Sequence, residues 1–371
     1  MIEILTIPGI RRRVIVVAAA LLCLVAADLT VRGIKGTLQQ YDGSYEPGEH
    51  RRKLSELRAL PAGRIVLMGS SRVQFALVPE EFERLTRRSA FNLGISGSFT
   101  ADWQVFARRL IAGHRPRLVI LGVNANSFRP DYLPTKAAYL LFDFHDLIDS
   151  IGREGPSWKV LRCYTRQKVD RMWTWFGRRR ELRMLGKEAL AWLLPKQARQ
   201  ARELRLRFTR KIPPDGFAHP EMVGRKVETL QQVLDVGGNV HFPQYDVPRF
   251  DAAASPFGRF DALLSTFRES EITVVVAYVP NSPRAEARWS RVEPKIKNRI
   301  SAICRDHGVP FLALDQNQLP RTNSDYFDEI HVTLPMARRI SRYLAQHIEA
   351  QRLLEAPATR LAQSEAPSST P

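Results

Sequence analysis

Five short apolar runs, separated by longer amphipathic segments, constrain the fold of this 371-residue chain more than any other feature. The runs are RIVLMG (64–69), SAFNLGI (89–95), RLVILGVN (117–124), ITVVVAYVP (272–280) and PFLALD (310–315). Continuous apolar runs of this length are typical of strands that are buried on both faces of a parallel sheet. The pattern therefore predicts an α/β fold whose parallel sheet has about five strands and is covered by helices on both sides.

The segments between the runs have the spacing of helices. Pro79 and Pro335 stand at positions typical of a first helical turn, and Thr100 is a typical N-cap. Apolar residues then recur at intervals of three and four. This spacing predicts helices over 79–85, 100–112, 257–270, 292–308 and 335–353.

A long insertion divides the strand series. Between about 130 and 250 no comparable run occurs, and residues 151–212 hold 18 Lys/Arg against 5 Asp/Glu. Part of this stretch, RRRELRMLGKEALAWLL, has a helical pattern, and several tryptophans lie among the charges. We expect the chain to divide into a signal anchor (1–35), a linker with a short helix (36–60), the first part of the core (61–150), a basic helical insertion (151–250), the second part of the core (251–353) and a disordered tail (354–371).

The N-terminus carries an export signal. Arg11, Arg12 and Arg13 precede an apolar segment whose uncharged core runs from Val14 to Ala27, just long enough with its flanks to span a bilayer. Arginines at this end favour a cytoplasmic N-terminus and a remainder on the periplasmic or extracellular side. A cleaved signal peptide is the main alternative, and a buried helix of a soluble protein is another. We expect a single-pass membrane anchor.

Charge and cysteine content narrow the possible partners. The net charge of +18 favours an anionic neighbour such as phospholipid headgroups, an acidic polymer or a nucleic acid. The export segment argues against nucleic acid, which lies mostly on the other side of the membrane. The three cysteines, Cys23, Cys163 and Cys304, form no metal-binding pattern, and we expect neither a metal nor a cofactor. Whether Cys163 and Cys304 form a disulfide stays open.

Polar residues follow the predicted strands, where open parallel sheets bind their ligands. Ser71 follows the first run, Gly97 the second and Asn124 the third, while Asp328 and His331 precede the last helix. A serine needs a base to become nucleophilic, an imidazole provides one near neutral pH, and a carboxylate orients that imidazole. Backbone amides and an asparagine amide can stabilise an oxyanion. Together these residues provide the nucleophile, the base, the orienting carboxylate and the oxyanion donors that acyl transfer requires.

These residues resemble the blocks of the SGNH/GDSL hydrolase superfamily over about 64–127 and 257–350. The nucleophile block is Gly69-Ser70-Ser71, the second-block glycine is Gly97, and Gly122-Val123-Asn124 matches the asparagine block. Asp328-Glu329-Ile330-His331 matches the final Asp-x-x-His. The membrane-anchored branch is similar to D-alanyl transfer proteins and to the SGNH proteins of polysaccharide O-acetylation.

The resemblance implies a flavodoxin-like three-layer sandwich and a serine esterase or acyltransferase acting on O-acyl groups of a cell-surface polymer. Ser71 would be the nucleophile, His331 the base and Asp328 its orienting acid. The oxyanion hole would use the Ser71 and Gly97 amides and the Asn124 side chain. Expected partners are the membrane, a surface polysaccharide or acyl donor, and a multi-spanning membrane O-acyltransferase.

Two departures from the family keep another hypothesis open. Ser70 and Ala125 stand where the family carries aspartate, so the chain is alternatively a catalytically silent assembly partner of an O-acyltransferase or polysaccharide export complex. Each candidate residue also has a purely structural interpretation, as a turn, a cap or a backbone partner. Asp315 is a second candidate to orient His331. Six other histidines are interpreted as structural or surface residues: His114, His145, His219, His241, His307 and His347.

Overall fold

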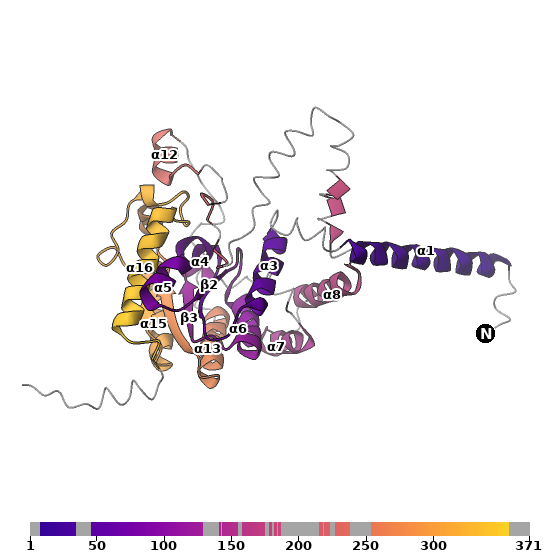
Figure 1. Cartoon of the computed structure of the whole chain (residues 1–371), viewed down its shortest axis with the longest axis horizontal. Coiled ribbons are helices and arrows are strands. Elements are labelled where there is room, and N and C mark those ends of the chain that lie inside the picture. Colours follow the sequence, from indigo (N-terminus) through magenta and orange to yellow (C-terminus); the bar gives the residue numbers. More distant parts are fainter. Residues whose placement is uncertain are drawn as a thin grey trace, which may run out of the picture.

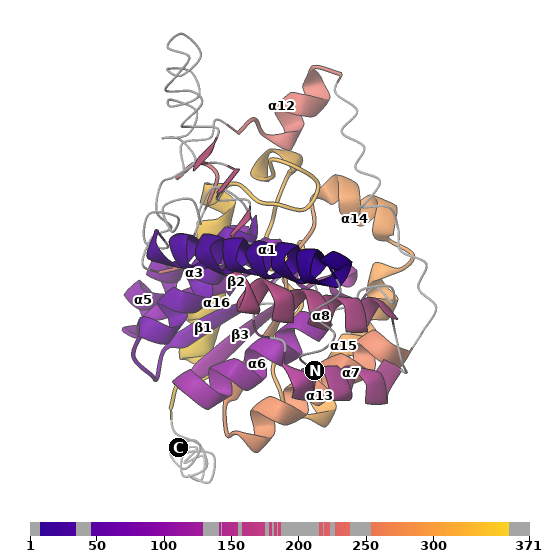
Figure 2. The same ribbon diagram turned by 90° about the vertical axis from the view of Figure 1, so that its right-hand side faces the viewer.

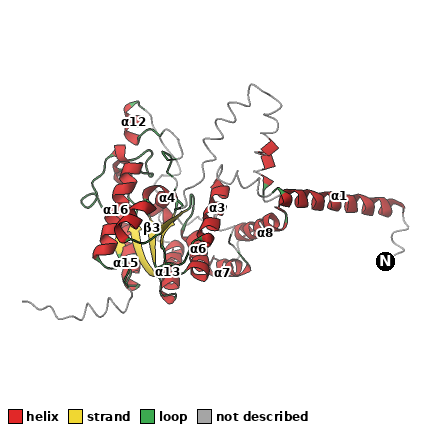
Figure 3. Cartoon of the chain, viewed as in Figure 1, coloured by secondary structure: helices red, strands yellow, loops and turns green. Residues whose placement is uncertain are grey.

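A five-stranded, all-parallel sheet forms the centre of the computed structural model (Figure 3). The strands are β1 (Ile65–Gly69), β2 (Ala90–Gly94), β3 (Leu118–Val123), β4 (Thr273–Tyr278) and β5 (Phe311–Leu312). Their order in the sheet, β2-β1-β3-β4-β5, is that of flavodoxin-like doubly wound folds. The predicted α/β class and the five-stranded parallel sheet are confirmed.

The structure describes most but not all of the chain. The described residues are 8–34, 46–128, 141, 143–154, 158–174, 178–179, 182–183, 185–186, 215–217, 219–222, 227–237 and 254–355. The predicted disordered tail lies almost entirely outside this set. So do most of the basic helical stretch from 178 to 194 and residues 35–45 of the predicted linker.

Helices cover both faces of the sheet. Side chains of β1 alternate between two cores, with Ile65 and Leu67 in one and Val66 and Met68 in the other. The first core is closed by α4 (Ser71–Ala76), α5 (Pro79–Thr86) and α16 (Leu334–Ala350). The second is closed by α3 (Glu46–Ala59), α6 (Thr100–His114), α13 (Ala254–Glu269) and α15 (Glu293–Asp306). Figure 1 shows these layers around the sheet.

The predicted strands and helices of the core are observed with small shifts, and several short helices were not predicted. Among them are α4, which begins at Ser71, and α14 (Pro283–Trp289). Strand β5 is shorter than the predicted run 310–315. It ends because Leu314 adopts a left-handed backbone conformation with φ of 49°. The Asp315 carboxylate then accepts hydrogen bonds from the amides of Asn317 and Gln318, which closes a turn.

Three glycines at matching positions of adjacent strands bring α4 close to the sheet. Gly69 pairs with Gly94 on one side and with Gly122 on the other. A Cβ at Gly94 would lie 2.2 Å from the Gln74 backbone nitrogen, and Cβ atoms at Gly69 and Gly122 would lie within 2.4 Å of a Val73 methyl. The chain therefore has room for α4 only because these strand ends lack side chains.

The N-terminal helix α1 (Pro8–Gly33) extends away from the sheet and its helices in Figure 1, and it crosses in front of them in Figure 2. Within the described residues it is the one helix long and apolar enough to cross a membrane, over Ile15–Gly33. Residues 15–27 are exposed, whereas Asp28 and Val31 are buried. The Asp28 carboxylate accepts a 2.7 Å hydrogen bond from Arg32 Nε, and Val31 packs with Ile34, Leu182 and Leu185.

The insertion carries α7 (Phe144–Glu154), α8 (Trp158–Met172) and α12 (Leu230–Asp235). It also returns to the core. The carbonyl of Asp215 accepts a 2.7 Å hydrogen bond from Asn92 of β2, and the side chains of Phe217 and Leu230 are buried in the core beside α16. The insertion is therefore partly built into the α/β domain.

Cys304 of α15 is a free thiol, and burial raises the pKa of this thiol to about 12.

Substituting Gly94→Ala tests the close approach of α4. The added Cβ would overlap the backbone of α4, so we expect a loss of about 1–3 kcal/mol in the free energy of unfolding. Gly258→Ala is the matched control, because no atom lies within 4 Å of its Cβ position and it stands inside α13. Urea unfolding measures the free energy of unfolding of both variants. Equal stability of the two variants would contradict the predicted overlap.

Candidate active site

Ser71 lies at the start of α4, directly after β1, where the chain turns sharply onto one face of the sheet. Ser70 is the N-cap of this helix, and its hydroxyl accepts a hydrogen bond from the Arg72 amide at 3.4 Å. After the neighbouring strand β3 the chain enters the opposite core, where Ala125 and Phe128 are buried. Ser71 therefore stands at the edge where the connections diverge, which is where doubly wound folds bind ligands.

Three predicted residues form a continuous hydrogen-bonded chain. His331 Nε2 lies 2.9 Å from Ser71 Oγ, although the two residues are 260 positions apart. His331 Nδ1 lies 2.7 Å from Asp328 Oδ2. The other Asp328 oxygen accepts hydrogen bonds from the Ile330 amide at 2.8 Å and the His331 amide at 2.7 Å. The structure thus joins a hydroxyl, an imidazole and a carboxylate in the order that general-base catalysis requires.

The carboxylate of Asp328 is held in its charged form. Burial alone would raise its pKa, but the positive charge that His331 can carry and the hydrogen bonds to this carboxylate lower the pKa below the usual 3.8. Burial is the largest single influence on this pKa, but the charge of His331 and the hydrogen bonds together outweigh it. An ionised Asp328 fixes the proton of the neutral imidazole on Nδ1 and leaves Nε2 free to accept the Ser71 proton.

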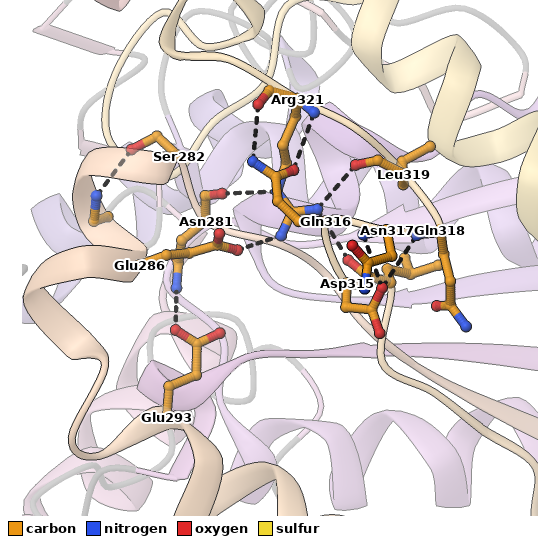
Figure 4. Close-up of polar contacts among 12 residues, drawn as sticks. Asn281, Ser282, Glu286, Glu293, Asp315, Gln316, Asn317, Gln318, Leu319 and Arg321 are labelled. Atoms are coloured by element: carbon orange, nitrogen blue, oxygen red, sulfur yellow. Dashed lines mark hydrogen bonds and ion pairs between the residues drawn. The ribbon is translucent and has the colours of Figure 1, made fainter.

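Asp328, and not Asp315, is the carboxylate beside His331. Asp315 instead accepts the amide hydrogen bonds that close the turn after β5. Figure 4 shows this turn beside Arg321, whose guanidinium donates to the Asn281, Leu314 and Leu319 carbonyls and to Glu286. Asn281 in turn contacts Glu293 and the guanidinium of Arg72 on α4. This buried polar network ties the loops after β4 and β5 to the helix that carries Ser71.

The turn containing Asp328 and His331 is anchored through the residue between them. Glu329 is fully buried and accepts two hydrogen bonds from Arg288 of α14, at 2.7 and 2.8 Å. Its carbonyl also accepts a hydrogen bond from the Ser282 amide at 3.1 Å. Such a paired arginine–carboxylate contact restricts orientation as well as distance. The contact therefore positions the turn relative to α14.

Aromatic rings surround the imidazole of His331. The ring of Phe75 lies edge-on to it with centroids 4.9 Å apart, and the ring of Phe327 stacks on it at 5.6 Å. The buried His219 contacts both phenylalanines at about 6 Å. These rings leave the imidazole few alternative orientations, so packing supports the hydrogen bonds that aim it at Ser71.

His219, which the sequence predicts to be a structural or surface residue, is buried next to the site. Its Nδ1 accepts from the Glu221 amide at 3.4 Å, so its proton lies on Nε2 and is donated to the Val332 carbonyl at 2.9 Å. Burial lowers its pKa. Sequence reasoning missed this contact because His219 lies in the insertion, outside any strand or helix pattern.

The three candidate oxyanion donors follow three different strands: Ser71 follows β1, Gly97 follows β2 and Asn124 follows β3. Gly97 has a positive φ of 70° in the turn after β2, which Ser98 Oγ ties to the Gly69 carbonyl at 3.0 Å. Asn124 is buried, and its Oδ1 has no hydrogen-bond partner in the part of the chain that the structure describes. Among the described residues, none accepts a hydrogen bond from the Ser71 amide, the Gly97 amide or the Asn124 side-chain nitrogen. These donors are thus available to a ligand.

The structure explains locally the two positions where the chain departs from the SGNH pattern. Ser70 caps α4, a task that aspartate and serine perform equally well. Ala125 is fully buried in an apolar core, where its small side chain fits. Neither residue belongs to the hydrogen-bonded chain of Ser71, His331 and Asp328.

Among the described residues, no group of three or more His, Cys, Asp and Glu side chains is arranged so that it could hold a metal ion.

Comparison with protein-family models finds no match to this chain, and comparison with curated proteins finds no matching sequence.

Replacing Glu329 by glutamine tests the anchoring of the turn. Arg288 would lose its charged partner, and we expect unfolding in urea to require about 1.5–3 kcal/mol less free energy. Glu349→Gln, an exposed change on α16, is the control. A double-mutant cycle with Arg288→Gln should give a clear coupling energy. Additive effects of the two changes would show that the contact does not hold the turn.

The pKa of Asp328 predicts a pH-dependent stability. Because the folded-state pKa lies below 3.8, the charged carboxylate stabilises the protein at and above that pH. This contribution disappears as the pH falls through the lower, folded-state pKa. We therefore expect the stability difference between the wild type and Asp328→Asn to be largest near neutrality and to shrink below pH 3.8. Urea unfolding at a series of pH values measures it, and a difference independent of pH would contradict the assignment.

Proposed function

We propose that this protein is a membrane-anchored serine esterase or acyltransferase of the SGNH type. The observation that carries the proposal is the hydrogen-bonded chain from Ser71 through His331 to Asp328. A serine hydroxyl in contact with an oriented imidazole is the arrangement needed for nucleophilic attack on an acyl carbonyl. Ser71 is the nucleophile, His331 the general base and Asp328 the residue that orients the base.

The reaction follows from the positions of these atoms. Ser71 Oγ attacks the acyl carbonyl while its proton passes to His331 Nε2. The resulting oxyanion is stabilised by the Ser71 and Gly97 amides and the Asn124 side chain. His331 then donates the proton to the leaving alcohol, and an acyl-serine remains. Water releases the acyl group as an acid, or a sugar hydroxyl accepts it as a new ester.

The resemblance to the SGNH superfamily supports this assignment. Four blocks occur in the family's order, and the doubly wound sheet has the strand order expected of a flavodoxin-like sandwich. Ser70 and Ala125 have local structural roles that account for these residues without a loss of activity, which supports an active enzyme over a silent assembly partner. The intact contact between Ser71 and His331 favours an active enzyme over that alternative.

The compartment and substrate class rest on the N-terminal segment and the charge. A single apolar helix preceded by three arginines favours an extracytoplasmic catalytic domain, held by an anchor or released after cleavage. The positive net charge favours substrates on an anionic envelope polymer. We infer O-acyl groups of a surface polysaccharide as the substrate. A multi-spanning membrane O-acyltransferase is the corresponding partner for transfer.

Ser71→Ala provides the direct test. We expect hydrolysis of a small aryl acetate to fall by about 10³-fold or more, because no other group replaces the nucleophile. Labelling by a fluorophosphonate probe should disappear in the same variant. Ser89→Ala, an exposed serine before β2, should leave both readouts unchanged. Probe-resistant wild-type protein, or full activity of Ser71→Ala, would overturn the mechanism.

A further inference from the structure

We propose that helices α7 and α8 form a second membrane-binding surface that rests on anionic phospholipid headgroups. We call it the α7–α8 face and define it by five exposed apolar side chains: Phe144, Ile148, Trp158, Leu161 and Met172. The inference concerns the orientation of the domain on the bilayer and is independent of the proposed enzymatic reaction.

Exposed apolar side chains are concentrated on this face. Among the described residues outside α1, only Met222 and Val236 are further large hydrophobic side chains with high exposure. Trp158 is 74% exposed and Met172 62%. The rings of Phe144 on α7 and Tyr164 on α8 are in contact, with centroids 6.5 Å apart, so the two helices present one surface. Patches of this kind mark interaction sites.

The pattern along α8 is that of a helix lying in a membrane interface. Trp158, Leu161 and Met172 are spaced by three and eleven residues, which places them on one stripe of the helix. Exposed cations flank this stripe, with Arg162 and Arg166 on one side and Lys168 on the other. In total α8 has five basic residues and one acidic residue. A tryptophan-containing apolar stripe between cations is typical of interfacial helices on anionic lipid.

The position of α8 relative to α1 provides the independent argument. Arg32, in the last turn of α1, donates a 3.3 Å hydrogen bond to the carbonyl of Met172 at the end of α8. Figure 1 shows α8 beside the end of α1 that meets the domain. The uncharged stretch from Val14 to Ala27 spans about 21 Å at 1.5 Å per residue.

A hydrocarbon core of about 30 Å is longer than this uncharged stretch. Residues 28–33 of α1 must then lie at the boundary of the bilayer, where Asp28 and Arg32 form their ion pair. The end of α8 contacts this same turn. The α7–α8 face is therefore held at the height of the headgroups when α1 spans the membrane, and its cations match the charge of anionic lipid.

The test uses the full-length protein reconstituted in vesicles. Cys23 and Cys163 are replaced by serine, the buried Cys304 is kept, and a nitrobenzoxadiazole fluorophore is attached at Leu161→Cys. Glu349→Cys is the matched control, since it is exposed on α16, on the opposite side of the domain from α1 (Figure 1). The vesicles contain phosphatidylcholine with or without phosphatidylglycerol, and a spin-labelled lipid serves as quencher.

We expect lipid quenching at position 161 to be several-fold stronger than at position 349, and stronger with phosphatidylglycerol than without it. Changing three cations of α8 to glutamine should remove the phosphatidylglycerol effect. The three cations of α8 in this test are Arg162, Arg166 and Lys168. The control changes three exposed cations of α15, Lys295, Arg299 and Arg305, to glutamine and should leave the phosphatidylglycerol effect in place. Thermal unfolding checks that each variant is folded.

Two outcomes would overturn the proposal. A fluorophore at position 161 that is as open to aqueous iodide as the one at position 349 would show that the face does not meet the bilayer. Protection from iodide without quenching by lipid would show that protein, such as a second copy of the chain, covers the face instead.

Discussion

The close approach of α4 to three parallel strand ends is the constraint on which the rest of the site depends. Gly69, Gly94 and Gly122 stand side by side in the sheet, and Cβ atoms at these positions would overlap Val73 or the backbone of Gln74. Close packing of this kind allows little adjustment. Because Ser71 begins α4, the position of its hydroxyl is set by the sheet itself and not by a mobile loop.

The second half of the site is positioned by buried charge. Asp328 and His331 lie in a turn that is closed by backbone hydrogen bonds from Phe327 to His331 and from Thr333 to Asp325. The position of this turn relative to the rest of the site still needs support from its neighbours. Glu329 provides that support through Arg288, and the contacts among Arg321, Asn281 and Arg72 link the adjacent loops to α4. The two halves of the site are therefore connected both directly, between His331 and Ser71, and through this polar network.

The insertion contributes to both ends of the molecule. Its segment around His219 packs beside the phenylalanines that hold the His331 ring, while the end of α8 contacts the last turn of α1. One insertion thus contacts the candidate site and the candidate membrane anchor. Its sequence predicts a basic helical region, and neither contact is apparent from it because each joins the insertion to residues far away in the chain.

The sequence by itself determined the α/β class, the five parallel strands and the set Ser71, Asp328 and His331. Local patterns carry this information, since apolar runs, helix caps and short motifs each involve residues close in the chain. Only the tertiary structure decided that His331 meets Ser71, 260 positions away, and that His219 of the insertion lies beside the site. These contacts join residues far apart in sequence, and packing and buried hydrogen bonds fix them in ways that no local pattern records.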